Sequence, residues 1–118
     1  MSHGQIRHIE IAGRTGPELE AFYAKLFGWG INARDMAGYR YADVTAPSTR
    51  PGMGIRHEPD GHPEVVIYVE VDDLEEAVRE AEILGAEIRI PPMEYGAQRF
   101  ALINDPEGNP VGLLAPDD

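Results

Sequence analysis

The sequence predicts an α+β domain in which two tandem βαβββ modules form one open, cup-shaped mixed sheet, with the helices on its outer face. Two helical patterns, each preceded by one strand pattern and followed by three, support this prediction. The halves also resemble each other at an offset of 58 positions (112 − 54), because Pro51-Gly52-Met53-Gly54-Ile55 matches Asn109-Pro110-Val111-Gly112-Leu113. One domain is expected over residues 1–118, with module one at about 5–58 and module two at about 63–115. A chance similarity between two αβ segments is the alternative.

The first helix is expected to begin near Thr15 and to end at Gly28. Thr15 and Glu18 have the spacing of a capping box, and Pro17 is tolerated in the first turn of a helix. Apolar residues then recur at helical spacing, and we assign this stripe to the core. The stripe consists of Leu19, Phe22, Tyr23, Leu26 and Phe27.

The second helix is expected to begin with Asp72 as its cap and to end at Gly85. Glu75 lies three residues after Asp72, which is again the capping-box spacing. The core-facing stripe of this helix consists of Leu74, Ala77, Val78, Ala81 and Leu84.

Eight strands are expected around these helices, separated by turn signals such as Ala37-Gly38, Pro47-Ser48 and Pro91-Pro92. The first strand of each module alternates between an aliphatic face, which should pack under the helix, and a mixed face that includes His8 and Glu10 in module one. The expected strands are 5–12, 31–35, 38–44, 52–57, 64–71, 87–91, 98–104 and 110–115.

Composition excludes several kinds of partner. The formal net charge is −11, which disfavours binding to nucleic acid and to anionic membranes. Cysteine is absent, so disulfides and thiolate metal sites are excluded, and the chain suits a cytoplasmic location.

Two groups of motifs resemble a known family. Ile9-Glu10-Ile11 followed by Phe22-Tyr23 and Leu26-Phe27-Gly28-Trp29 is similar to the first module of the vicinal oxygen chelate superfamily, which includes glyoxalases, bleomycin-resistance proteins and extradiol dioxygenases. Phe100-Ala101 leading into residues 105–113 resembles the closing strand pair of that superfamily. The resemblance implies paired modules around a cleft, usually in a homodimer.

The resemblance also implies where a metal would be held. Metal-using members place ligands at positions that correspond here to His8, Gly54, Val66 and Gly112. Only His8 carries a donor, whereas a catalytic zinc site generally needs about three protein ligands. We therefore expect no metal and no other cofactor; a nonstandard divalent-metal site that adds Glu10 to His8 is the disfavoured alternative. The glycines either allow a ligand to approach closely or mark a bulge.

Further candidates would line the cleft between the modules. Glu10 and Tyr68 occupy matching positions and are candidate catalytic residues for acid–base chemistry. The alternative for Glu10 is a structural ion pair with Arg40, Arg56 or Arg99. Aromatic and apolar side chains often line small-molecule pockets. The candidate ligand-binding residues are His8, Glu10, Trp29, Tyr41, Met53, Gly54, Val66, Tyr68 and Gly112.

These observations favour a glyoxalase/bleomycin-resistance-like protein that binds a small organic molecule in the cleft without a metal. The alternative is an enzyme of the lyase, isomerase or dioxygenase class that uses a nonstandard metal site or Glu10/Tyr68 acid–base chemistry. A structural or regulatory dimer without a ligand is a third possibility, since fold alone does not determine function.

Overall fold

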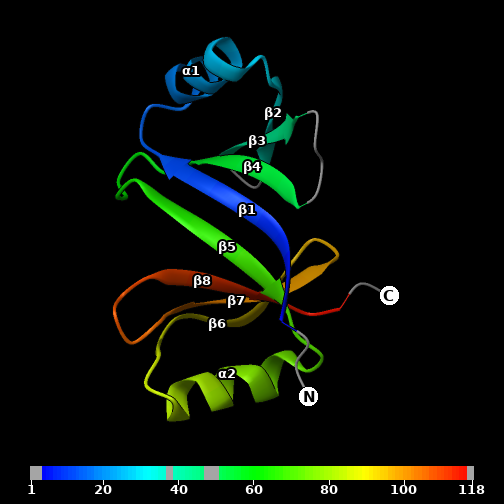
Figure 1. The fold of residues 1–118 in the computed structure, drawn as a ribbon, viewed down its shortest axis with the longest axis vertical. Coiled ribbons are helices and arrows are strands. Elements are labelled where there is room, and N and C mark those ends of the chain that lie inside the picture. Colours follow the sequence, from blue (N-terminus) through cyan, green and yellow to red (C-terminus); the bar gives the residue numbers. More distant parts are fainter. Residues whose placement is uncertain (1–3, 37–38, 47–50, 117–118) are drawn as a thin grey trace. The chain divides into compact units, whose positions relative to one another are not determined.

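The computed structural model describes residues 4–36, 39–46 and 51–116 and divides the chain into two compact units (Figure 1). The first unit is His8–Val66, and the second combines Met1–Arg7 with Ile67–Asp118. The elements are β1 (Gln5–Gly13), α1 (Pro17–Phe27), β2 (Gly30–Met36), β3 (Tyr39–Thr45), β4 (Gly52–His57), β5 (Glu64–Glu70), α2 (Leu74–Ile83), β6 (Glu87–Tyr95), β7 (Gln98–Asn104) and β8 (Pro110–Leu114).

The described residues form eight strands in one open mixed sheet, with the order β2-β3-β4-β1-β5-β8-β7-β6. Within each module the outer strands are antiparallel, and the first strand is parallel to the last: β1 to β4, and β5 to β8. Two helices accompany the strands in the described chain. The predicted α+β class with repeated βαβββ modules is therefore confirmed.

In the first unit, α1 starts differently from the prediction. Gly16 is the N-cap, no side chain caps the helix, and Pro17 takes the first helical position. The expected capping box of Thr15 and Glu18 is therefore wrong: the chain turns at Gly16 with a φ of 60°, which glycine adopts without steric cost. The predicted end is confirmed, because Gly28 closes α1 in the left-handed conformation.

The predicted core stripe of α1 is correct only in part, because Leu19 and Tyr23 are partly buried and Leu19 lies against Gly13 of β1. Glu20 is buried and forms a bidentate ion pair with Arg40 of β3. The Nε and Nη2 atoms of Arg40 donate to Glu20 Oε2 at 2.8 Å and to Oε1 at 2.9 Å. Phe22, Leu26 and Phe27 are instead more than half exposed. Periodicity locates an apolar stripe, but here the Arg40 guanidinium makes a carboxylate the better buried group.

In the second unit, α2 packs on β6, β7 and β8 (Figure 1). Its N-cap is Asp73 rather than the predicted Asp72, and the Asp73 carboxylate accepts a hydrogen bond from the Glu76 backbone N–H at 3.1 Å. The helix buries Leu74 and Val78, as predicted, whereas Leu84 beyond its end is 71% exposed. The core under α2 consists of Val71, Leu74, Val78, Ala101, Ile103 and Leu113.

The proline pair on β6 does not form the predicted turn. β6 continues through Pro91 and Pro92 to Tyr95, with register shifts between Ile88 and Ile90 and between Ile90 and Met93. β6 lies at an edge of the sheet, where missing N–H donors are tolerated. The turns expected at 37–38 and 47–48 lie outside the described residues.

No helix in the described ranges is long and apolar enough to cross a membrane.

Candidate functional site

The first unit concentrates polar side chains on one face of its strands. Glu10 of β1 lies opposite Gly54 of β4, and Tyr41 of β3 lies opposite Arg56 of β4. Directly opposed residues project from the same face of a sheet, as do residues two positions apart on one strand. The register therefore defines a polar face made by His8, Glu10, Tyr41, Asp43, Gly54 and Arg56.

The other face of these strands is mostly aliphatic and lies on the side of α1. Ile55 and Ala42 are buried there, and Ile9 and Ile11 alternate with the polar residues of β1. Arg40, from the same face of β3, reaches Glu20 of α1. The predicted division of β1 into an aliphatic and a mixed face is thus confirmed, and the helix leaves the polar face uncovered within this unit.

His8 and Tyr41 meet above Gly54. The His8 Nε2 and Tyr41 Oη atoms are 2.7 Å apart, although the residues come from strands on opposite sides of β4. A Cβ atom on Gly54 would overlap the Tyr41 ring. Glycine at position 54 therefore creates the space in which the tyrosine crosses β4 and reaches the histidine.

Burial sets the protonation of His8. Loss of solvent disfavours the imidazolium and lowers the pKa of His8 from its ordinary value of 6.5, while the negative charge of Asp43 partly opposes this effect. His8 is therefore a neutral imidazole near pH 7. One ring nitrogen donates and the other accepts, and the tautomer decides whether Tyr41 donates to His8 or accepts from it.

Glu10 forms an ion pair with Arg56 on the same face. The Glu10 Oε2 and Arg56 Nη1 atoms are 2.6 Å apart, and Glu10 is 5% exposed. The Nη2 atom of Arg56 also lies 3.0 Å from Glu64 Oε2, and its Nε atom lies 3.6 Å from Glu58 Oε1. Of the three arginines considered from the sequence, Arg56 is the partner of Glu10, while Arg40 binds Glu20 and Arg99 binds Glu75.

A second ion pair extends the polar face toward β2. Arg34 lies opposite Tyr41, and its Nε atom is 2.9 Å from Asp43 Oδ2. These two residues were missed by the sequence analysis. The alternation of Tyr41 and Asp43 with Ala42 and Val44 is a strand signal that identifies Asp43 as a neighbour of Tyr41 on one face.

In the second unit, a tyrosine also covers a glycine. Tyr68 of β5 lies opposite Gly112 of β8, and a Cβ atom on Gly112 would overlap the Tyr68 ring. Tyr68 is 9% exposed. The space above Gly112 is therefore filled by the protein's own side chain, as it is above Gly54, and neither glycine lies at a break in its strand pairing.

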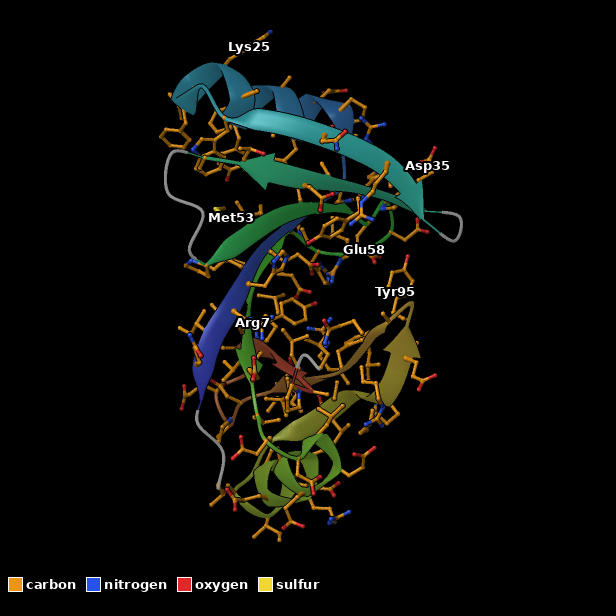
Figure 2. The ribbon with its side chains drawn as sticks, turned by 90° about the vertical axis from the view of Figure 1, so that its right-hand side faces the viewer. Arg7, Lys25, Asp35, Met53, Glu58 and Tyr95 are labelled. Carbon is orange, nitrogen blue, oxygen red and sulfur yellow. The ribbon has the colours of Figure 1, made fainter. Side chains whose placement is uncertain are left out.

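Three other candidates lie away from the polar face. Trp29 stacks on Tyr23 in an aromatic cluster at the end of α1, with the ring centroids 5.6 Å apart and an angle of 12° between the ring planes. Met53 of β4, labelled in Figure 2, projects from the aliphatic side because its neighbour Gly54 faces the polar side. Val66 is fully buried.

Metal-binding groups are scarce in the part of the chain that the structure describes. Within residues 4–36, 39–46 and 51–116, no group of three or more His, Asp or Glu side chains is placed to hold a metal ion. On the polar face, the imidazole of His8 contacts Tyr41, and the carboxylate of Glu10 contacts Arg56.

Comparison with known families gives a match over most of the chain. The model of the glyoxalase-like domain family matches residues 9–114. The chain belongs to this family. The suspected relation to the vicinal oxygen chelate superfamily is thereby confirmed, since glyoxalases are members of it. A search of curated proteins found no match.

Several solved structures share the fold of this glyoxalase-like domain at low sequence identity. A hypothetical protein from Bacillus halodurans C-125 is 13% identical, with a TM-score of 0.73 over 98% of this chain and 96% of that one. Methylmalonyl-CoA epimerase from Mycobacterium tuberculosis is 18% identical, with a TM-score of 0.70 over 99% of this chain and 90% of that one. The Mn(II)-bound glyoxalase from Novosphingobium aromaticivorans is 18% identical, with a TM-score of 0.68 over 98% of this chain and 40% of that chain. At these identities the similarity establishes the fold, and the activity must be argued from the site.

Proposed function

We propose that this glyoxalase-like domain binds a small oxygen-containing organic molecule on the polar face of its first unit, and that it does so without a resident metal. The His8–Tyr41 pair above Gly54 carries the proposal. A neutral imidazole and a phenol together offer both a hydrogen-bond donor and an acceptor to a ligand carbonyl or hydroxyl group. The cysteine-free chain suits the reducing cytoplasm, where we place this binding activity.

The surroundings of the pair suit a ligand of this kind. Arg34 and Asp43 are about half exposed beside it, so their polar atoms are accessible from solvent. Glu10 and Arg56 are mostly buried, and Arg56 also binds Glu64, so this ion-pair network is a fixed support beside the His8–Tyr41 pair. Small-molecule sites commonly combine a few oriented polar groups with a rigid scaffold.

Metal independence is supported by the side chains at the ligand positions that the family resemblance implies. His8 is hydrogen-bonded to Tyr41, and the side chain of Val66 has no atom that could bind a metal. The positions of Gly54 and Gly112 are filled by tyrosine rings. This donor set does not fit the family's metal site, which requires several ligands that converge on one ion.

A thermal-shift screen tests the proposal. Small ketones, hydroxy acids and aromatic acids are screened with the intact chain, and a true ligand at saturation should raise the Tm by about 5 °C or more. Tyr41→Phe and His8→Gln should reduce this shift. Tyr95→Phe, which removes a phenol hydroxyl from the other unit, is the matched control and should leave it unchanged.

The same assay tests metal independence. Mn²⁺, Ni²⁺ and Zn²⁺ should not stabilise the chain. Strong stabilisation by one of these ions that disappears in His8→Ala would contradict the proposal, as would copurification of the metal in a 1:1 ratio.

A second candidate function is acid–base catalysis on the same face. A neutral histidine within hydrogen-bond distance of a tyrosine hydroxyl is an arrangement that can transfer a proton. Glu10 and Tyr68 are less suited to acid–base catalysis, because the Glu10 carboxylate forms an ion pair with Arg56. Ligands from the screen that are carbon acids are incubated with the protein in deuterium oxide. Incorporation of deuterium into their C–H bonds by the wild type but not by His8→Gln would support catalysis over binding alone.

A further inference from the structure

An exposed ion pair lies next to the His8–Tyr41 pair on the polar face. Arg34 lies opposite Tyr41 in the β2–β3 pairing, and Asp43 follows two residues later on β3, so these side chains project from the same face. The Arg34 Nε atom is 2.9 Å from Asp43 Oδ2, and the Nη2 atom donates to Oδ1 at 3.2 Å. The two side chains are 50% and 46% exposed, so a ligand on this face can contact both.

The Arg34–Asp43 pair retains hydrogen-bonding capacity on both of its members. A guanidinium has five N–H groups, and a carboxylate accepts about four hydrogen bonds. The Nε and Nη2 groups of Arg34 contact Asp43, so the Nη1 group is available to a ligand oxygen, and the Asp43 oxygens can accept further from a ligand N–H group. A carboxamide is complementary to this arrangement, because its C=O group accepts and its N–H groups donate.

The charges on the polar face disfavour a carboxylate in the same position. Asp43 already balances the charge of Arg34, so a ligand carboxylate bound to Arg34 would lie beside a second negative charge. Arg56, on the same face, contacts three carboxylates, so that network carries surplus negative charge. The net charge of −11 acts in the same direction. An uncharged group that both donates and accepts therefore fits this position better than an anion.

Tyr41 determines how far the ion pair lies from His8. Arg34 is on the edge strand β2, whereas His8 is on β1, beyond β3 and β4. The Tyr41 side chain crosses Gly54 of β4 and places its hydroxyl oxygen 2.7 Å from His8 Nε2. A ligand that contacts both pairs at once must therefore have a body about as long as a tyrosine side chain, with a polar group at each end.

We propose that the ligand of the polar face is an uncharged aromatic amide: its carboxamide pairs with Arg34 and Asp43, and a hydroxyl or carbonyl group at its other end binds the His8–Tyr41 pair. This inference rests on the proposed function and names the class of molecule that the site takes. The carboxamide accepts from Arg34 and donates to Asp43, so both members of the ion pair keep a hydrogen-bond partner. The flat ring between the polar ends lies along the Tyr41 ring.

Nuclear magnetic resonance titration with para-hydroxybenzamide and para-hydroxybenzoate tests the proposal, because only the second compound carries a carboxylate. The amide should shift the backbone signals of Tyr41 and Asp43 and bind with a Kd about tenfold or more below that of the acid. The titration is repeated at about 0.3 M NaCl, which screens the general repulsion, so the preference that remains reports the local contacts. An acid that binds on this face as tightly as the amide would overturn the proposal while supporting the proposed function.

Asp43→Asn tests the role of the ion pair. Removal of the negative charge should weaken amide binding and strengthen acid binding, so that the preference falls by about fivefold or more. Glu76→Gln, which removes a carboxylate from the exposed ion pair with Arg79 on α2, is the matched control and should leave the preference unchanged. A preference that survives Asp43→Asn would overturn the proposal. The proposal also fails if neither compound binds, whereas the proposed function fails only if no compound in the thermal-shift screen gives stabilisation that depends on Tyr41.

Discussion

Gly54 lies on β4 under the ring of Tyr41, with His8 beyond it. A methyl group at this position must displace Tyr41, so we expect Gly54→Ala to reduce the free energy of unfolding by about 1–3 kcal/mol, the usual cost of overpacking. Gly30→Ala is the matched control, because a Cβ atom there makes an ordinary 3.5 Å contact with Thr45. Urea unfolding of both variants measures the difference. An equal cost for the two substitutions would show that the Tyr41 ring does not require the glycine.

His8 makes the stability of the chain depend on pH in a defined direction. Well above pH 6.5 the imidazole is neutral in both the folded and the unfolded chain, so it adds no pH dependence there. As the pH falls from 6.5 toward the lower pKa of the folded chain, the unfolded chain takes up a proton at His8 and the folded chain does so less readily. The free energy of unfolding must therefore fall as the pH decreases through this range.

His8→Gln removes this contribution while retaining a side chain that forms hydrogen bonds. We expect the variant to lose less stability than the wild type between pH 7.5 and pH 5.5, as measured by urea unfolding at each pH. Every other side chain is the same in the two proteins, so the difference between the two curves isolates His8. Parallel curves would mean that His8 has the same pKa in the folded and unfolded chains.

At the scale of elements, α1 and α2 are held by different forces. α2 buries leucine and valine, whereas Glu20 is the buried residue of α1 and depends on Arg40. Arg40→Ala should therefore loosen α1 and increase the hydrogen-exchange rates of its backbone amides by about tenfold or more. Arg99→Ala removes the comparable partner of Glu75 on α2 and is the matched control, with little change expected in α2. Mass spectrometry of exchanged peptides distinguishes the two helices.

The same contrast explains which parts of the helices were predictable. Gly28 and the buried face of α2 follow from local sequence patterns, and both predictions are confirmed. The burial of Glu20 on α1 was not predicted, because it depends on an ion pair with Arg40, twenty residues away in sequence. Local periodicity contains no information about such a distant partner.

For the whole molecule, the 58-residue repeat was the strongest signal in the sequence. It places Gly54 on β4 and Gly112 on β8, at matching positions of the two modules. The repeat did not predict what fills the space above each glycine: Tyr41 reaches Gly54 from β3, while Tyr68 reaches Gly112 from β5. These contacts depend on strand order and register, so the sequence predicted the fold more completely than the site.

The net charge of −11 affects the stability of the whole molecule. Repulsion among like charges destabilises a compact state, and added salt screens it over distances that exceed the Debye length, about 10 Å at 0.1 M. The ion pairs in the described chain are short-range contacts, and Arg56–Glu10 is largely shielded from solvent, so salt should weaken them less than it weakens the general repulsion. We therefore expect the Tm to rise between low salt and about 0.3 M NaCl, measured at low protein concentration so that association does not contribute. Equimolar sucrose controls for solute effects without ionic screening. A Tm that falls with NaCl would mean that attractive ion pairs outweigh the repulsion.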